Sequence, residues 1–301
     1  MSLVPVNRGL QFIIPAVIYL TILVIYPTVY LYYMIFNSLN PLFDVTPRFT
    51  GLQNIYTLAQ DPDAAYSIMA MLLLTGITVP LQLALGSLLA ILFTSPHLRG
   101  RLLLRSIMLI PLSIPAVIVG LNWKMIFFTY GPLNTFLSTV GLEPQPWLSA
   151  PFGNTFNTFF VLAVLDIWQW TPFVTLAVAA GIESIPPYIQ EAAALDGASR
   201  LQVIRHIVFP LSKTVIIIVL LFRLIDSLKI FDIIYMLTFG GPGNLTTTLP
   251  FYIYKVGFTL TAAKADIGYA SLLAVILLLI STFLVLLVLT RVLNVRKVVW
   301  E

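Results

Sequence analysis

The chain has 301 residues, of which 59% are hydrophobic and 9% are charged, and its mean hydropathy is +0.98. Apolar runs of about 20 residues recur along it, and a water-soluble surface cannot be built from such a composition, so we expect an integral membrane protein. The chain has no cysteine, which excludes disulfides and thiolate metal sites. The net charge of +4 is too small to indicate a nucleic-acid partner, and two isolated histidines, His97 and His206, do not suggest a metal site.

Six segments are long and apolar enough to cross the hydrocarbon core, which requires about 20 residues of helix. They are residues 10–36, 68–93, 102–128, 155–181, 214–239 and 267–289. The first lacks the cleavage site of a signal peptide, so we count it as a span. The sequence predicts an all-α integral membrane protein with six transmembrane helices, forming one domain over residues 1–301, with both termini on the same side.

Lysine and arginine are distributed unevenly between the two sets of connecting segments. The termini and the second and fourth loops carry Arg8, Arg99, Arg101, Arg105, Arg200, Arg205, Lys213, Arg291, Arg296 and Lys297. The opposite loops carry Arg48, Lys255 and Lys264. Because positive residues favour the cytoplasmic side, both termini and the fourth loop are expected in the cytoplasm.

The fourth predicted span carries Asp166, Trp168, Gln169 and Trp170 within five residues. Polar and ionisable residues inside a span usually face a cavity or a partner. Trp168 and Trp170 lie about 200° apart on a regular helix, so both cannot face one direction, although a bend at Pro172 would loosen this restriction. Tryptophan is also a common interfacial anchor, and we expect one of the two, but not both, on a solute pathway.

A polar segment, residues 183–212, follows the fourth span and contains EAAALDGASRLQVIRHIVFP at 191–210. Residues 191–195 favour helix, Gly197 is free to adopt positive φ, and Ser199 can cap a second helix. The apolar stripe of that helix would consist of Leu201, Ile204, Ile207 and Val208. We expect Pro210 to end it. Such short helices are marginal in water, so the unit should lie on the membrane, on the protein's own cytoplasmic ends or on another protein.

The fifth predicted span carries Arg223, Asp226, Lys229 and Asp232, which alternate in sign every three residues. Residues three apart on a helix can pair, so one interpretation is a self-neutralising ladder. The other places part of this face on a water-filled pathway. The segment GGPGNLTTT at 240–248 then interrupts the helix with glycines and a proline, as an ordinary turn would.

The spacing of Glu191, Ala192, Ala193, Gly197, Ile207 and Pro210 resembles the cytoplasmic EAA loop of binding-protein-dependent ABC importer permeases. One departure is Phe209, where that pattern usually has leucine. The stretches at 48–58, 123–134, 168–173, 181–187 and 229–254 resemble the sugar-type permeases of this group, which include maltose and glycerol-phosphate permeases. The similarity runs over about residues 10–295, without the large external insert of the maltose subunit.

The resemblance implies a type I ABC importer permease fold and a half-channel. Such a permease pairs with a second permease, receives solute from an external sugar-binding protein and couples to a dimeric cytoplasmic ATPase. The chain has no GxxxxGK[ST] phosphate loop, so ATP and Mg are expected on the ATPase and no cofactor on this chain. Import of a sugar is the expected function, without an enzymatic activity of its own.

Candidate residues for two sites follow, the coupling residues from the resemblance and most pathway residues from the chemistry of a sugar. The coupling residues would be Glu191, Ala192, Ala193, Asp196, Gly197, Leu201, Ile204, Ile207 and Pro210. A sugar site combines carboxylates and amides with flat aromatic rings. The candidate pathway residues are Asp166, Trp168, Trp170, Asp226, Asp232, Tyr235, Gly240 and Gly241, the last two because this loop approaches the cavity or the binding protein in the family.

Two other classes of function were compared with this interpretation. A membrane-embedded enzyme would need an HExxH, GxSxG or paired-histidine constellation, which the sequence lacks. An ion-coupled secondary transporter of a small polar solute could use Asp166 and Asp226, but it would not require the EAA pattern. The sequence does not identify the sugar, and an anionic solute stays open because Arg223 and Lys229 could meet a phosphate.

Overall fold

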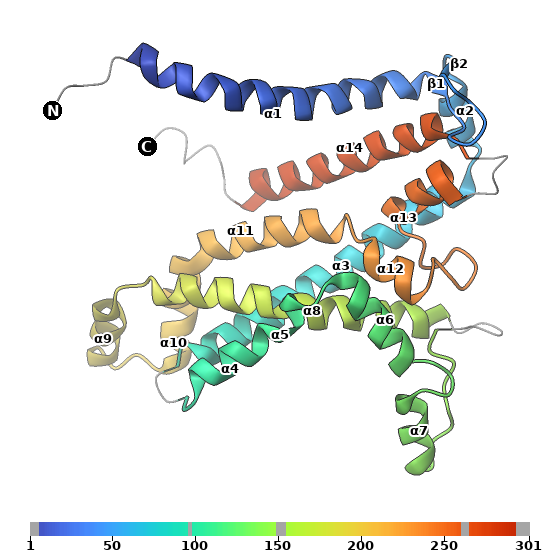
Figure 1. Ribbon diagram of the computed structural model, residues 1–301. Helices are drawn as coiled ribbons and strands as arrows, with labels where there is room; N and C mark the ends of the chain where they lie inside the picture. Colours follow the sequence, from blue (N-terminus) through green and yellow to red (C-terminus); the bar gives the residue numbers. More distant parts are fainter. Residues whose placement is uncertain (1–5, 96–97, 149–154, 260–264, 293–301) are drawn as a thin grey trace. The chain divides into compact units, whose positions relative to one another are not determined.

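The computed structural model describes residues 6–95, 98–148, 155–259 and 265–292. In chain order these contain α1 (Val6–Ile35), β1 (Asn37–Ser38), β2 (Arg48–Phe49), α2 (Gln53–Ala59), α3 (Pro62–Phe93), α4 (Arg101–Met108), α5 (Ile110–Ser113), α6 (Ala116–Ile126), α7 (Pro132–Thr139), α8 (Thr155–Glu183), α9 (Pro187–Leu195), α10 (Arg200–Val203), the π-helix η1 (Ile204–Val208), α11 (Phe209–Ser227), α12 (Asp232–Leu237), α13 (Leu249–Tyr254), the π-helix η2 (Lys255–Thr259) and α14 (Ile267–Val292) (Figure 1). His97, Lys264, Arg296 and Lys297 lie outside the described residues.

Five helices in the described part of the chain are long and apolar enough to cross a membrane, and a bent pair makes a sixth. The five are Phe12–Ile35, Pro62–Phe93, Asn157–Glu183, Arg200–Ser227 and Ile267–Arg291. The prediction of a helical membrane protein is therefore confirmed. The placement of both termini in the cytoplasm stays a prediction.

The predicted third span, 102–128, is broken. Residues Arg101–Ser113 and Ala116–Ile126 form two arms at 93° (Figure 1). Ile114 and Pro115 are extended at the break, with ψ of 124° and 139°, because proline lacks an N–H and disfavours helix at the residue before it. The side-chain amide of Gln169 donates to the carbonyl oxygen of Ile114 at 3.2 Å, which satisfies a backbone group that the break leaves free.

The predicted fifth span, 214–239, also differs from one continuous helix. α11 ends at Ser227 and α12 begins at Asp232. Thr248 donates its hydroxyl to the carbonyl oxygen of Ile230 within this break, at 3.1 Å. The expectation that Pro210 ends the preceding element is wrong, because α10, η1 and α11 form one helical stretch. Pro210 is the second residue of α11 and lies two positions after the end of η1, within this stretch.

The described chain divides into two compact units, which lie within residues 1–64 with 252–279 and within residues 65–251 with 280–301. The single transmembrane domain predicted from the sequence stays a prediction. In the first unit, β1 and β2 pair antiparallel with Asn37 opposite Phe49. Asp266 caps α14 by accepting the N–H of Gly268 at 2.7 Å, and it also accepts the hydroxyl of Ser38 at 2.7 Å. These bonds tie the end of α1 to the start of α14.

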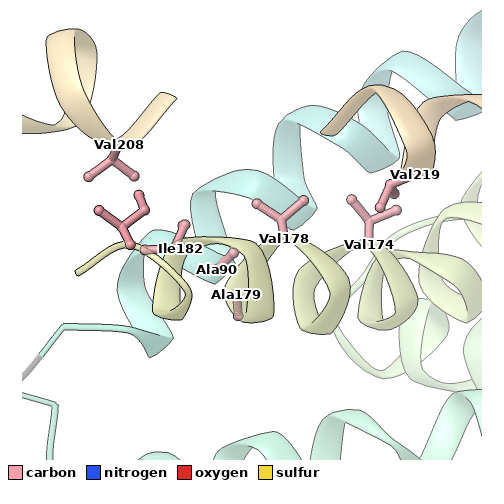
Figure 2. Close-up of a cluster of buried hydrophobic side chains, with 8 residues drawn as sticks. Ala90, Val174, Val178, Ala179, Ile182, Val208 and Val219 are labelled. Carbon is pink, nitrogen blue, oxygen red and sulfur yellow. The ribbon is translucent and has the colours of Figure 1, made fainter. Parts of the chain in front are cut away.

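In the second unit an apolar core joins α3, α8 and the helix that begins at α10. Figure 2 shows Val174, Val178 and Ile182 along α8, with Ala90 of α3 and Val208 and Val219 nearby. Small residues allow the helices to approach closely: a Cβ on Gly86 would lie 2.5 Å from Val174, and one on Gly181 would lie 3.0 Å from Val215. Such small-residue contacts are typical of helix packing in membranes.

Candidate functional site

The coupling segment, which we define as residues 183–212, contains two short helices joined by a turn. Gly197 has φ of +77°, as expected from its place between α9 and α10. Ser199 forms a capping box with Gln202: its hydroxyl accepts the Gln202 N–H, and the Gln202 side chain accepts the Ser199 N–H at 2.7 Å. Both conformational predictions are therefore confirmed, and the turn is well defined before any partner binds.

The coupling segment has an inner and an outer face. Ile185 and Val208 are buried in the apolar core of the unit, with Val203 and Ile189 packed against it. On the outer face Leu195 is 90% exposed, Leu201 is 74% exposed and Glu191 is also exposed. Ile204 and Ile207 are half-buried, so the four predicted stripe residues do not share one environment. Of the other predicted coupling residues, Ala193 is half-buried and Ala192, Asp196 and Pro210 are exposed.

A cavity of about 510 Å³ lies between the coupling segment and the ends of α3 and α8. Its lining includes Ser95, Glu191 and Arg200. Arg200 donates to the Ser95 hydroxyl across 2.8 Å. No sequence pattern identified Ser95, which lies 105 positions before Arg200 in the chain.

The predicted polar residues of α8 and α11 meet in a buried cluster around Arg223, which is 1% exposed. Its guanidinium donates from Nε to Gln82 at 2.8 Å, from Nη1 to Asp226 at 2.5 Å and from Nη2 to Asp166 at 3.3 Å. Gln82 in turn donates to Asp166 at 2.8 Å. All three nitrogens of Arg223 are therefore engaged, and the cluster joins α3, α8 and α11.

Gln82 was missed by sequence reasoning. It lies inside the predicted second span, 68–93, among largely apolar residues. An amide inside a span needs a partner, and this was the signal that could have identified it.

The two tryptophans of the fourth span contact different groups, as their spacing predicted. Trp170 lies under the Arg223 guanidinium, whose carbon is 4.4 Å from the ring centroid. Trp168 packs edge to face on Trp123, with centroids 5.4 Å apart, and is 36% exposed. Trp168 is therefore the more accessible of the two rings.

The charged residues of the predicted fifth span do not continue as one ladder. Arg223 pairs with Asp226 as residues three apart on a helix can, but Lys229 lies in the break and Asp232 begins α12. The Asp226 side chain is 48% exposed. It borders a second cavity, of about 430 Å³, together with Lys229 and apolar residues of α11. Asp232 is exposed, and Tyr235 stacks on Phe231 with centroids 5.6 Å apart.

The loop after α12 is ordered by side-chain hydroxyls. Thr246 donates to the carbonyl oxygen of Gly241 at 2.7 Å, and Thr247 donates to that of Gly240 at 3.2 Å. Gly240 has φ of +81°, and the preceding Phe239 also has positive φ. The loop is therefore a fixed structure with little space inside it.

Alanine at Gly240 is expected to destabilise this loop. The added Cβ would lie 2.3 Å from the Thr247 hydroxyl and 2.8 Å from the Phe251 ring, at a φ that L residues rarely adopt. We expect a loss of about 2 kcal/mol or more, measured as thermal stability in detergent. Gly241 is the matched control, since its Cβ would meet only the Thr238 carbonyl oxygen at 3.2 Å. Equal stability of the two variants would contradict this account, and uptake by the Gly241→Ala variant tests a pathway role without that clash.

The amino-acid sequence of the chain is similar to those of known membrane transport components. A family model described as a binding-protein-dependent transport system inner membrane component matches residues 82–298. The trehalose/maltose transport system permease protein MalF of Thermococcus litoralis is 38% identical over 213 residues, which are 69% of this chain and 70% of that protein. The sulfoquinovosyl glycerol transport system permease protein SmoG of Agrobacterium fabrum is 35% identical over 268 residues, 89% and 84% of the two chains.

Two solved structures have a similar fold. One is a bacterial alginate ABC transporter in complex with an alginate pentasaccharide-bound periplasmic protein, with a TM-score of 0.78 and 24% identity over 94% of each chain. The other is a bacterial ABC transporter involved in the import of the acidic polysaccharide alginate, with a TM-score of 0.77 and 25% identity over 93% of each chain.

Proposed function

Because this chain belongs to the family of binding-protein-dependent transport system inner membrane components, we infer that it is the permease subunit of a carbohydrate ABC importer. It has the type I permease fold of the alginate transporters, and it is a transport subunit of the inner membrane rather than an enzyme. The family match carries this conclusion. The relatives that transport trehalose, maltose or a sulfoquinovosyl glycerol support a carbohydrate as the solute.

We propose that the chain works with three kinds of partner: a second permease, a dimeric ATPase and an external sugar-binding protein. The second permease would complete the pathway as a heterodimer, and the ATPase would bind ATP and Mg, so that this chain carries no cofactor. The support is the resemblance of the coupling segment to the EAA loop and the periplasmic protein in one related structure.

The outer face of the coupling segment supports a role in docking on the ATPase. Leu195 and Leu201 are large apolar side chains that the rest of the described chain leaves uncovered, which supports a surface that a partner covers. Glu191 lies exposed on α9, where it can form a charge-assisted hydrogen bond. Closure of the ATPase dimer around ATP would then move this segment, and the helix that continues into α11 would carry the movement into the membrane.

The contacts of Arg223 support a structural role for its guanidinium, and Lys229, which is exposed, is the cation that an anionic solute could meet. Its guanidinium is buried and donates to Gln82, Asp226 and Asp166, so it is held inside the cluster and faces those side chains. We propose that Asp166 and Trp170 support the cluster. The remaining candidates Trp168, Asp226, Asp232, Tyr235, Gly240 and Gly241 are then the ones to test on the pathway.

Gly197→Trp is expected to abolish docking of the ATPase. Apart from its two neighbours in the chain, no atom of the described residues lies within 4 Å of a Cβ at Gly197, so the indole would extend outward into the space of a partner. Gly197→Ala is the matched control, because it carries the same positive-φ strain of about 1 kcal/mol without the bulk. The measurement is co-purification of the ATPase in mild detergent, with sugar-stimulated ATP hydrolysis in the presence of the binding protein.

Loss of the ATPase in the tryptophan variant, and its retention in the alanine variant, would support docking through this turn. Retention of stimulated hydrolysis in both variants would overturn it. If the wild-type chain purified alone and transported solute in liposomes without ATP, the importer assignment itself would fail and a secondary transporter would take its place.

A further inference from the structure

The ends of three helices are held together beside the coupling segment. Arg105 of α4 donates to the carbonyl oxygen of Phe93 at the end of α3, at 3.0 Å, and to Glu183 at the end of α8, at 2.5 Å. We call Phe93, Arg105 and Glu183 the clasp. The ends of α3, α4 and α8 are thus linked by one guanidinium, and we expect them to move together.

Ser95 extends this arrangement by two residues beyond Phe93. It is 7% exposed, its N–H donates to the Leu92 carbonyl oxygen, and its own carbonyl oxygen accepts from Leu98. Its hydroxyl accepts from Arg200, which is the first residue of α10 and directly follows the capping residue Ser199. Both ends of this hydrogen bond are therefore fixed by backbone structure.

The cavity of about 510 Å³ leaves the coupling segment with reduced packing at this point. The segment is continuous in the chain with α8 and α11, but across the gap it reaches the end of α3 only through contacts that cross or border the cavity. Arg200 crosses the gap toward α3, whereas Val208 and Ile185 connect the segment with α8 and α11 through the apolar core.

We propose that Arg200 and Ser95 form a strut that makes the clasped ends of α3, α4 and α8 follow the coupling segment when the ATPase moves it. Ser95 and Arg200 are then positioning residues for transport, with no role in ATPase docking. This inference rests on the proposed function, because the movement must come from the ATPase. It adds a second route into the membrane beside the continuous helix of α10, η1 and α11.

Distance measurements between spin labels can test the strut. The chain has no cysteine, so labels can be attached at Leu92→Cys on α3 and Tyr188→Cys on α9 once cysteines of the partner subunits are replaced. Both positions are exposed, at 48% and 67%. Electron–electron double resonance is then recorded on the assembled transporter, without nucleotide and after trapping with ATP and vanadate.

With the strut intact, the two labels should keep their distance within about 1 Å between the two states, because α3 follows α9. In Ser95→Ala the distance should match the wild type without nucleotide and change by about 2 Å or more on trapping. Ser95→Thr keeps the hydroxyl and should behave as the wild type. Thr94→Val is the matched control, because Thr94 borders the same cavity but, within the described residues, its hydroxyl donates to the carbonyl oxygens of Ala90 and Ile91 at the end of α3.

A distance that changes equally in wild type and Ser95→Ala, or in neither, would overturn the strut. Loss of the ATPase from the wild-type complex would instead contradict the proposed function, and the strut with it. The two failures are distinguishable, since ATPase content is measured on the same sample before trapping.

Discussion

Gly268→Ala is expected to prevent the first unit from reaching its native packing. The added Cβ would lie 1.8 Å from the carbonyl oxygen of Asn37, far inside contact distance. Asn37 cannot easily move away from this Cβ. Its carbonyl oxygen accepts a hydrogen bond from the Asn54 side-chain amide at 2.9 Å, and Asn37 is paired with Phe49 between β1 and β2. We expect a loss of about 3 kcal/mol or more, at the upper end of overpacking effects. The measurement is thermal denaturation in detergent, followed by size-exclusion chromatography.

Gly76→Ala provides the control for this prediction. Gly76 lies inside α3, and apart from that helix's own backbone and the two neighbouring residues, no atom of the described residues lies within 4 Å of an added Cβ. Alanine favours helix over glycine by up to about 1 kcal/mol. Its thermal stability should equal or exceed that of the wild type. A Gly268→Ala protein as stable as Gly76→Ala would mean that the end of α1 does not lie against the start of α14.

Arg223→Met should also lower the stability of the protein strongly, because it leaves the buried carboxylate of Asp166 without its cation. Asp166 is 1% exposed and would lose the cation that neutralises it, while Gln82 would lose a donor. Breaking a buried pair by removing one partner costs about 3–5 kcal/mol. We expect a corresponding fall in thermal stability, and also reduced transport, because α3, α8 and α11 are joined at this point.

The double variant Arg223→Met with Asp166→Asn separates charge from packing. It removes both buried charges, so it should recover part of the lost stability. Lys229→Met is the matched control at an exposed position and should change stability by less than about 0.5 kcal/mol. If the double variant were less stable than Arg223→Met alone, the cluster would depend on hydrogen bonds more than on charge neutralisation.

Hydropathy was enough to find the membrane segments, but it could not find where they break. Pro115 interrupts the third predicted span, whereas Pro80 and Pro172 remain inside the long helices α3 and α8. A proline is therefore not sufficient to predict a break. The Ile114 carbonyl oxygen is satisfied by Gln169, 55 residues away, and no local pattern contains that information.

The break between α11 and α12 was harder to predict, because residues 228–231 contain neither glycine nor proline. The charged residues Arg223, Asp226, Lys229 and Asp232 are spaced by three, which is the spacing expected of one continuous helix. A remote hydroxyl, that of Thr248, accounts for one backbone carbonyl in the break. In both cases the deciding interaction comes from tertiary structure.

The candidate coupling site was more predictable than the pathway. Gly197 and Ser199 act through their own backbone and a neighbour three residues away, so spacing alone identified the turn. The environments of Asp166 and Arg223 depend on Gln82 of α3, which is 84 residues from Asp166, and on Trp170 of α8, which lies under a guanidinium that belongs to α11. The sequence could identify these residues as costly inside a membrane but could not determine which of them bind one another.

The π-helix η1 determines the direction in which the turn at Gly197 points around the helix axis. A π turn holds about one residue more than an α turn, and η1 lies between the turn at Gly197 and the part of α11 whose buried side includes Arg223. One residue corresponds to about 100° of rotation around a helix axis. If η1 were an ordinary α-helix, Leu201 and Gly197 would be rotated by about a quarter-turn around the helix axis relative to the Arg223 cluster. The wider turn of η1 therefore links the orientation of the buried cluster to the direction from which the proposed ATPase partner would approach.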